Sequence, residues 1–153
     1  MPAVDTVVET SLAPEAVRAA LLDFSERRPE LWPGITPSLY KVYSVGETEA
    51  VVQEGTKLPV MGAFWAKEHY EFAAPDLVRW TVEESNFCAP GSFVSARLAP
   101  RDGGGTRIDL HWERTPTSLA GKIVSRLIVA SKGKPIKQSV AKALAALERP
   151  ETN

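Results

Sequence analysis

The chain has 153 residues, a net charge of −1 and 44% hydrophobic residues, an ordinary composition for one globular domain. A domain of this length can build its own core. The near-neutral charge predicts no general attraction to nucleic acid or to anionic lipid. A single cysteine, Cys88, excludes an intramolecular disulfide and leaves a cysteine-based zinc site without ligands. We expect one domain over residues 1–150 and a tail at 151–153.

The sequence predicts neither a membrane span nor a secretory signal. No stretch approaches 18 apolar residues, so we expect no stable membrane insertion. Residues 1–9 include two acids and no basic segment before an apolar run, which favours a cytoplasmic protein. Charge is uneven, because residues 115–150 hold seven basic residues and one acid, Glu148. We interpret these basic side chains as a solvated face rather than a membrane-docking one, since no broad aromatic face accompanies them.

The first part of the chain predicts a strand and then a helix. Residues 3–10 are β-branched and half polar, which is typical of a strand. Pro14 and Glu15 open a helix, because proline suits the first helical position and an acid suits the positive end of the helix dipole. The apolar stripe of this helix is Val17, Leu21 and Phe24.

Strands dominate the middle of the chain. Alternation of apolar and polar residues is clearest near the last strand, where Ile108, Leu110 and Trp112 alternate with polar residues. The expected strands cover residues 38–45, 48–55, 63–73, 78–82, 92–99 and 107–113. Short turns join them, which predicts an antiparallel meander.

After Pro116 the pattern becomes helical. Apolar residues recur at helical spacing from Leu119 to Leu147, and Gly133 and Pro135 interrupt them. Because proline clashes with the preceding turn, we expect a kink or break near residues 131–135. Strands followed by helices on one face predict an α+β fold.

This order of elements resembles the START-like superfamily, the helix-grip group also called SRPBCC that contains polyketide cyclases and dehydratases and lipid-transport proteins. The segments that carry the resemblance are 13–17 at the first helix, 31–34 after it, 75–80 entering a strand and 104–108 entering the last strand. The resemblance implies a curved antiparallel sheet of about six or seven strands around a long C-terminal helix, with an internal cavity. It also implies a small apolar ligand, without naming one.

Strand parity then selects the side chains that face the cavity. In the strand over 63–73, the set containing Phe64, Glu68 and Tyr70 is more apolar than its alternate and is placed inside. In the strand over 48–55 we favour Ala50, Val52 and Glu54 over the opposite set. A turn at Gly46-Glu47 would place Tyr43 opposite Ala50. The predicted ligand-binding residues are Tyr43, Glu54, Glu68, Tyr70, Trp80, Trp112, Ile123 and Leu127.

Glu54 and Glu68 would then face the cavity from neighbouring strands. A buried carboxylate needs a partner or has a raised pKa. Two such groups could orient a hydroxylated ligand or act as an acid/base pair, unless strand twist places one at the rim. Trp80, Trp112 and Tyr70 could stack on a flat ligand, although aromatic residues at this spacing are more often ordinary core.

Other reactive side chains carry no site in this interpretation. His69 and His111 fall on the outward parity, so we expect no metal and no cofactor. Cys88 lies in a loop without an adjacent base and is expected to be a structural thiol.

Three functions remain open from the sequence. The first is binding of a small hydrophobic or amphipathic molecule in an internal cavity, by a monomer or homodimer. The second is an enzyme of the polyketide cyclase or aromatase type that uses the carboxylates and Tyr70. The third is a protein-interaction domain with a filled core.

Overall fold

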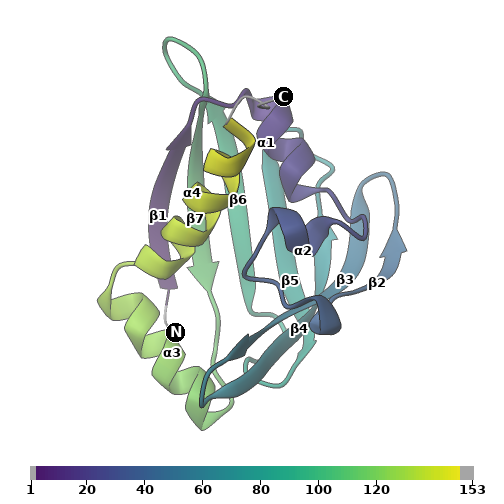
Figure 1. Ribbon diagram of the computed structural model, residues 1–153, viewed down its shortest axis with the longest axis vertical. Coiled ribbons are helices and arrows are strands. Elements are labelled where there is room, and N and C mark those ends of the chain that lie inside the picture. Colours follow the sequence, from purple (N-terminus) through teal and green to yellow (C-terminus); the bar gives the residue numbers. More distant parts are fainter. Residues whose placement is uncertain (1–2, 149–153) are drawn as a thin grey trace.

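A seven-stranded antiparallel sheet curves around the helices in the computed structural model, which describes residues 3–148 (Figure 1). The strand order is β1-β7-β6-β5-β4-β3-β2. The strands are β1 (Ala3–Thr10), β2 (Lys41–Val45), β3 (Glu49–Leu58), β4 (Gly62–Glu71), β5 (Leu77–Ser85), β6 (Phe93–Pro100) and β7 (Thr106–Glu113). The helices are α1 (Pro14–Leu21), α2 (Arg28–Leu31), the 3₁₀ turn η1 (Pro37–Leu39), α3 (Leu119–Ala130) and α4 (Lys134–Glu148).

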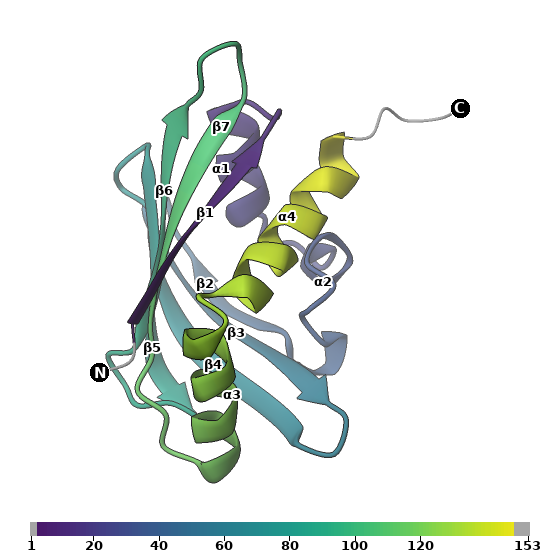
Figure 2. The ribbon, with the colours of Figure 1, turned by 90° about the vertical axis from the view of Figure 1, so that its left-hand side faces the viewer.

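All the helices lie on the concave side of the sheet, and α4 crosses it diagonally (Figure 2). The α+β helix-grip architecture expected from the sequence is therefore confirmed. The tail expected at residues 151–153 lies outside the described residues. The core fills the space between α1, the sheet and the C-terminal half of α4, where Val8, Val17, Ile108 and Leu144 are almost completely buried.

The parity assigned to the main strands is confirmed. In β4, alternate residues from Phe64 to Tyr70 are buried. In β3, Ala50 and Val52 are buried, and in β7, Ile108, Leu110 and Trp112 are buried. Each of these strands therefore turns one face to the core, as period-2 alternation requires.

The C-terminal helical region is two helices rather than one. The chain leaves α3 through two residues in the left-handed region, Lys132 at φ 56° and Gly133 at φ 78°. Gly133 N donates to Ile128 O at 2.8 Å, and Lys132 N donates to Val129 O at 3.1 Å, which is the hydrogen-bond pattern of a helix C-cap. The break expected near 131–135 is confirmed, but Pro135 does not cause it. Pro135 is the second residue of α4, where a proline needs no amide partner.

Tyr43 does not face the concave side, which corrects the expected register of the first hairpin. Val45, rather than Tyr43, pairs with Ala50, and the register shifts between Val42 and Ser44. Tyr43 therefore sits in a bulge, and its ring lies 4.4 Å from the Lys67 ammonium on the outer face. The connection spans residues 46–48 instead of two residues, and this longer turn with the bulge moves the strand past its expected partner.

Candidate functional site

A cavity of about 430 Å³ lies between the sheet, α2 and the first half of α4. This volume lies within the range typical of small-molecule sites. The wall is mainly apolar and aromatic, with a few charged and polar groups. Its residues are Leu21, Arg28, Trp32, Gly34, Ile35, Glu54, Thr56, Tyr70, Trp80, Val94, Trp112, Arg114, Pro135, Ile136, Ser139 and Val140.

Arg28, Glu54 and Tyr70 form a polar cluster on the cavity wall. The Tyr70 hydroxyl donates a hydrogen bond to the Glu54 carboxylate, and Arg28 Nη2 donates to Tyr70 Oη at 3.2 Å. Arg28 Nη2 also lies 3.5 Å from Glu54 Oε1. Arg28 is held in place by two backbone carbonyls, those of Leu21 and Asp23, each at 2.9 Å. The cluster is therefore fixed in position before any ligand binds.

Burial raises the pKa of Tyr70 well above its ordinary value, and the negative charge of Glu54 raises it further. The phenol therefore stays protonated at neutral pH and keeps its O–H as a donor. Tyr70 also stacks on Trp80, with ring centroids 5.5 Å apart, and meets the edge of Phe24 at 4.9 Å. These ring contacts fix the plane of the phenol.

A second charged pair, Glu68 and Arg114, lies deeper in the protein. Arg114 Nη2 donates to Glu68 Oε1 at 3.0 Å, and Arg114 Nη1 approaches Cys88 Sγ at 3.8 Å. Burial raises the pKa of Glu68 to about 7 although Arg114 lowers it, and the charge of Glu54 adds to the increase. Glu68 can therefore gain or lose a proton near neutral pH. Arg114, and not Glu68, reaches the cavity wall.

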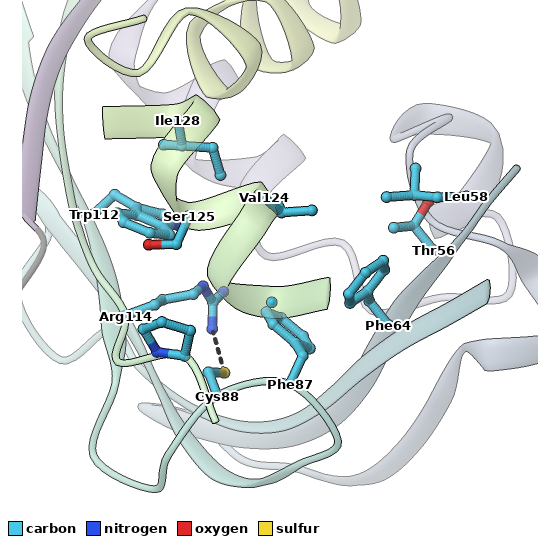
Figure 3. Close-up of a pocket in the computed structure, with 12 residues that line it drawn as sticks. Thr56, Leu58, Phe64, Phe87, Cys88, Trp112, Arg114, Val124, Ser125 and Ile128 are labelled. Carbon is cyan, nitrogen blue, oxygen red and sulfur yellow. Dashed lines mark hydrogen bonds between the residues drawn. The ribbon is translucent and has the colours of Figure 1, made fainter. Parts of the chain in front are cut away.

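A smaller cavity of about 190 Å³ lies between α3 and the β3–β4 hairpin (Figure 3). Its wall is almost entirely apolar, and Val124 points from α3 toward Leu58 and Phe64 in Figure 3. Thr56, Trp112 and Arg114 line both cavities. The two cavities are therefore adjacent and share part of their walls. Among residues 3–148, Arg114 is the charged residue that lines both of them.

Gly121 brings α3 close to the loop that follows β5. A Cβ atom at this position would lie 2.7 Å from Phe87 O, closer than side-chain carbons approach a backbone oxygen. The Ser118 side chain caps the helix by accepting a hydrogen bond from Gly121 N at 2.9 Å. Cap and glycine together fix α3 beside the smaller cavity.

Five of the eight predicted ligand-binding residues lie in or beside these cavities. Glu54, Tyr70, Trp80 and Trp112 line the larger cavity, and Glu68 is buried behind it. The other three point away from both cavities. Tyr43 is on the outer face of the sheet, and Ile123 and Leu127 lie on the outward side of α3, 47% and 62% exposed. Helical spacing identified Ile123 and Leu127 as one face but could not say which face meets the sheet.

Sequence reasoning missed the two arginines. A signal for Arg114 was present, because it follows Trp112 by two residues and shares its inward parity. Arg28 lies in a short helix outside any periodic pattern, so nothing local marked it as buried. His69 and His111 pair with acids on the outer face, and Cys88 is a buried free thiol.

Within residues 3–148, no group of three or more His, Cys, Asp and Glu side chains is arranged to hold a metal ion. No helix in the same residues is long and apolar enough to cross a membrane.

Comparisons with known proteins identify the fold. No model of a known protein family and no curated protein sequence matches the chain. Solved structures do. A protein from Thermus thermophilus aligns with a TM-score of 0.75 at 15% identity, over 97% of this chain and 100% of that one. A START superfamily protein from Mycobacterium smegmatis aligns at 0.75 and 11% identity, over 95% and 98%. The Zhui aromatase/cyclase from a Streptomyces species aligns at 0.75 and 14% identity, over 96% and 93%.

The chain therefore has the START-like, or SRPBCC, helix-grip fold. At these identities the likeness establishes the fold alone. Function has to be argued from the cavities and their side chains.

Proposed function

We propose that the protein binds a small hydrophobic or amphipathic molecule in the larger cavity. One observation carries this proposal: a cleft of about 430 Å³, open to solvent on one side, lies against Trp80 and Trp112. A concave, mainly aromatic wall with a few placed polar groups is the feature expected of a small-molecule site. An interaction domain with a filled core would instead occupy this space with its own side chains.

The polar cluster indicates what kind of ligand fits. Arg28 offers N–H donors and Glu54 offers an acceptor within one cluster on a mainly apolar wall, and Arg114 adds a second donor group to that wall. A rigid aromatic or polycyclic ligand with one oxygenated edge would place that edge on the cluster and its flat faces between the aromatic rings. The lipid-like and polyketide-like ligands expected from the sequence both include such molecules.

The second candidate is a cyclase or aromatase activity. Glu68, with a pKa of about 7, and the protonated Tyr70 are the two groups near the cavity suited to proton transfer at neutral pH. The similarity of the fold to an aromatase/cyclase is compatible with this candidate. Arg114 separates Glu68 from the cavity, however, so we place binding first. The cytoplasmic location expected from the sequence stays a prediction.

The tryptophans provide a direct test of ligand binding. Three of the four tryptophans, Trp32, Trp80 and Trp112, line the larger cavity. An apolar fluorescent dye that binds there should accept energy from them and saturate at one dye per chain. Val140→Phe should weaken dye binding by about tenfold, because the added ring takes up space that the dye needs and forcing both into it costs on the order of 1–3 kcal/mol.

Leu147→Phe is the matched control, because Leu147 lies on the same helix, is exposed and does not line the cavity. It should leave dye binding unchanged. Dye that binds without saturation, or equally to both variants, would contradict the proposal. Native mass spectrometry of the purified protein would then identify any ligand that stays bound.

A further inference from the structure

The outward face of α3 is apolar, where a surface helix normally presents polar side chains. Leu119, Ile123 and Leu127 are 77%, 47% and 62% exposed. Because they are four residues apart, they form one stripe along the helix. The fully buried residues of α3 are small, Gly121 and Ser125, and its inward Val124 and Ile128 line the smaller cavity. Three of the largest apolar side chains of the helix therefore face away from the protein.

A second exposed apolar point lies at the tip of the β3–β4 hairpin. Val60 is fully exposed and has a left-handed backbone, with φ 70°. Both views place this hairpin tip and α3 at the same end of the molecule (Figures 1 and 2). The smaller cavity lies between the two elements, since Leu58 and Phe64 line it from the hairpin and Val124 lines it from α3. The exposed apolar side chains therefore flank an apolar cavity.

The charged residues on α3 and on residues 55–67 of the hairpin are basic. Lys122 and Arg126 are exposed and lie beside the apolar stripe on α3. The chain has no acid from Arg114 to Leu147, and none from Gly55 to Lys67. The two acids that flank this segment face the concave side of the sheet: Glu54 lines the larger cavity and Glu68 is buried. Glu84 on the neighbouring β5 is paired in register with Lys67. An apolar stripe edged by basic residues is complementary to a lipid bilayer with anionic headgroups, whose acyl chains are apolar and whose surface is negatively charged.

We propose that α3 and the hairpin tip dock reversibly on an anionic lipid surface, with the smaller cavity opening toward the lipid. Leu119, Ile123, Leu127 and Val60 would enter the apolar boundary, while Lys122 and Arg126 meet the anionic headgroups. The role of this docking, which rests on the proposed function, is to let an apolar ligand pass from the lipid to the cavities without crossing water. A second copy fits the surface poorly, because stacking α3 on α3 would bring Lys122 and Arg126 against like charges.

Vesicle sedimentation tests the docking without any ligand. The protein should sediment with vesicles that contain about one third phosphatidylglycerol in phosphatidylcholine, and much less with phosphatidylcholine alone. Binding should weaken as salt rises. The double variant Lys122→Gln/Arg126→Gln should lower partitioning about 30-fold, because each basic residue near an anionic surface contributes about a fivefold factor. Ile123→Ser/Leu127→Ser should lower it about tenfold or more, since it removes the apolar contact.

The control with the same charge change is Lys137→Gln/Lys142→Gln on α4, where both lysines are exposed away from the stripe. It should reduce binding far less than the α3 variant. No sedimentation of the native protein at low salt would overturn the proposal. So would equal losses in the two charge variants. A native dimer that Ile123→Ser/Leu127→Ser makes monomeric, or an acidic protein that binds α3 while vesicles do not, would assign the surface to protein contact instead.

The dye titration keeps this result separate from the proposed function. All four substituted α3 residues are exposed, so these variants should bind dye as the native protein does. Dye binding without vesicle binding would reject the docking and leave the ligand site intact. Vesicle binding without dye binding would reject the ligand site.

Discussion

The helices α3 and α4 cover the same concave face of one sheet, yet they bury different kinds of side chain. α4 inserts Leu144 into the core beside Val8 and Ile108, where all three side chains are almost completely buried. α3 buries only Gly121 and Ser125, and a cavity remains beneath it. The sheet is therefore filled beneath the C-terminal half of α4, and it is hollow beneath α3 and the first half of α4.

The largest expected effect is a difference in stability between two substitutions on α4, one in the packed core and one on the cavity wall. Leu144→Ala should lower the free energy of unfolding by about 3–4 kcal/mol, because a fully buried leucine leaves a cavity that the core cannot close. Ile136→Ala on the cavity wall should cost about half as much, since its side chain is already partly exposed to the cavity. Urea unfolding measures both values.

In dye binding, the variant that costs less stability should have the larger effect. Ile136→Ala should change the affinity, because Ile136 lines the larger cavity. Leu144→Ala should leave it near the native value wherever the protein remains folded. Equal stability losses in the two variants would show that α4 is packed uniformly along its length.

The next effect concerns Glu68, whose folded pKa of about 7 exceeds its ordinary value of 4.5 because burial disfavours the charged form. A raised folded pKa stabilises the protein below the unfolded pKa, and this contribution is lost as pH rises from about 4.5 to about 7. Glu68→Gln keeps the side chain neutral. It should therefore raise stability at pH 8 by on the order of 2–3 kcal/mol, since a tenfold change in a protonation equilibrium corresponds to about 1.4 kcal/mol. Below about pH 4, where the carboxyl is protonated in both the folded and the unfolded chain, the gain should vanish.

Urea unfolding at several pH values checks this prediction, with the exposed Glu84→Gln as the control. The ion pair with Arg114 is already included in the folded pKa, so burial outweighs it. A Gln variant that is less stable at pH 8 would show the reverse: that the unpaired Arg114 costs more than the buried carboxylate.

A substitution at Tyr70 tests the polar cluster on the wall of the larger cavity. Tyr70→Phe keeps the ring contacts with Trp80 and Phe24 but removes the hydroxyl that donates to Glu54. Stability should fall by about 1–2 kcal/mol, because Glu54 then keeps only Arg28 as a partner. Thermal unfolding measures this change.

The matched control is Tyr40→Phe, whose hydroxyl donates to Ser25 O at 3.0 Å in an exposed position. Its loss should be smaller, because water replaces the hydrogen bond. If Tyr70→Phe were neutral, the hydrogen bond to Glu54 would contribute nothing to the folded protein, and the polar cluster would not be fixed in advance of a ligand.

The strands and their buried faces could be predicted because period-2 alternation is a local property of the sequence. Parity placed Glu54, Glu68 and Tyr70 on the concave side without any structure. The partners of the two carboxylates could not be found this way. Arg28 comes from a four-residue helix, and Arg114 directly follows β7, so both meet the carboxylates through long-range packing. Local patterns fix which face a side chain takes and do not say what it meets there.

The prediction of which side of α3 faces the cavity was wrong for a different reason. In α3 the apolar residues Leu119, Ile123 and Leu127 lie on one side and Val124 and Ile128 on another, so periodicity alone gives the helix no unique buried side. The buried side is the one that holds the small residues Gly121 and Ser125, and Gly121 lets the helix approach the loop at Phe87. Ile123 and Leu127 were predicted to line the cavity because they are large and apolar. In the structure they face outward.

The smallest expected effect tests the corrected position of Tyr43. Its ring lies on the outer face between the ammonium groups of Lys41 and Lys67, at 4.7 and 4.4 Å, and it is 46% exposed. Tyr43→Ala should therefore cost less than about 1 kcal/mol, the value of an exposed cation–π contact. Dye affinity should not change, because Tyr43 lines neither the larger nor the smaller cavity. Trp80→Ala provides the contrast, since Trp80 lines the larger cavity and its loss should alter dye binding. A Tyr43→Ala variant that loses dye affinity as Trp80→Ala does would mean that the bulge in β2 can be removed on ligand binding. The hairpin would then slide toward the register in which Tyr43 faces Ala50, and the outer edge of the sheet would belong to the ligand site.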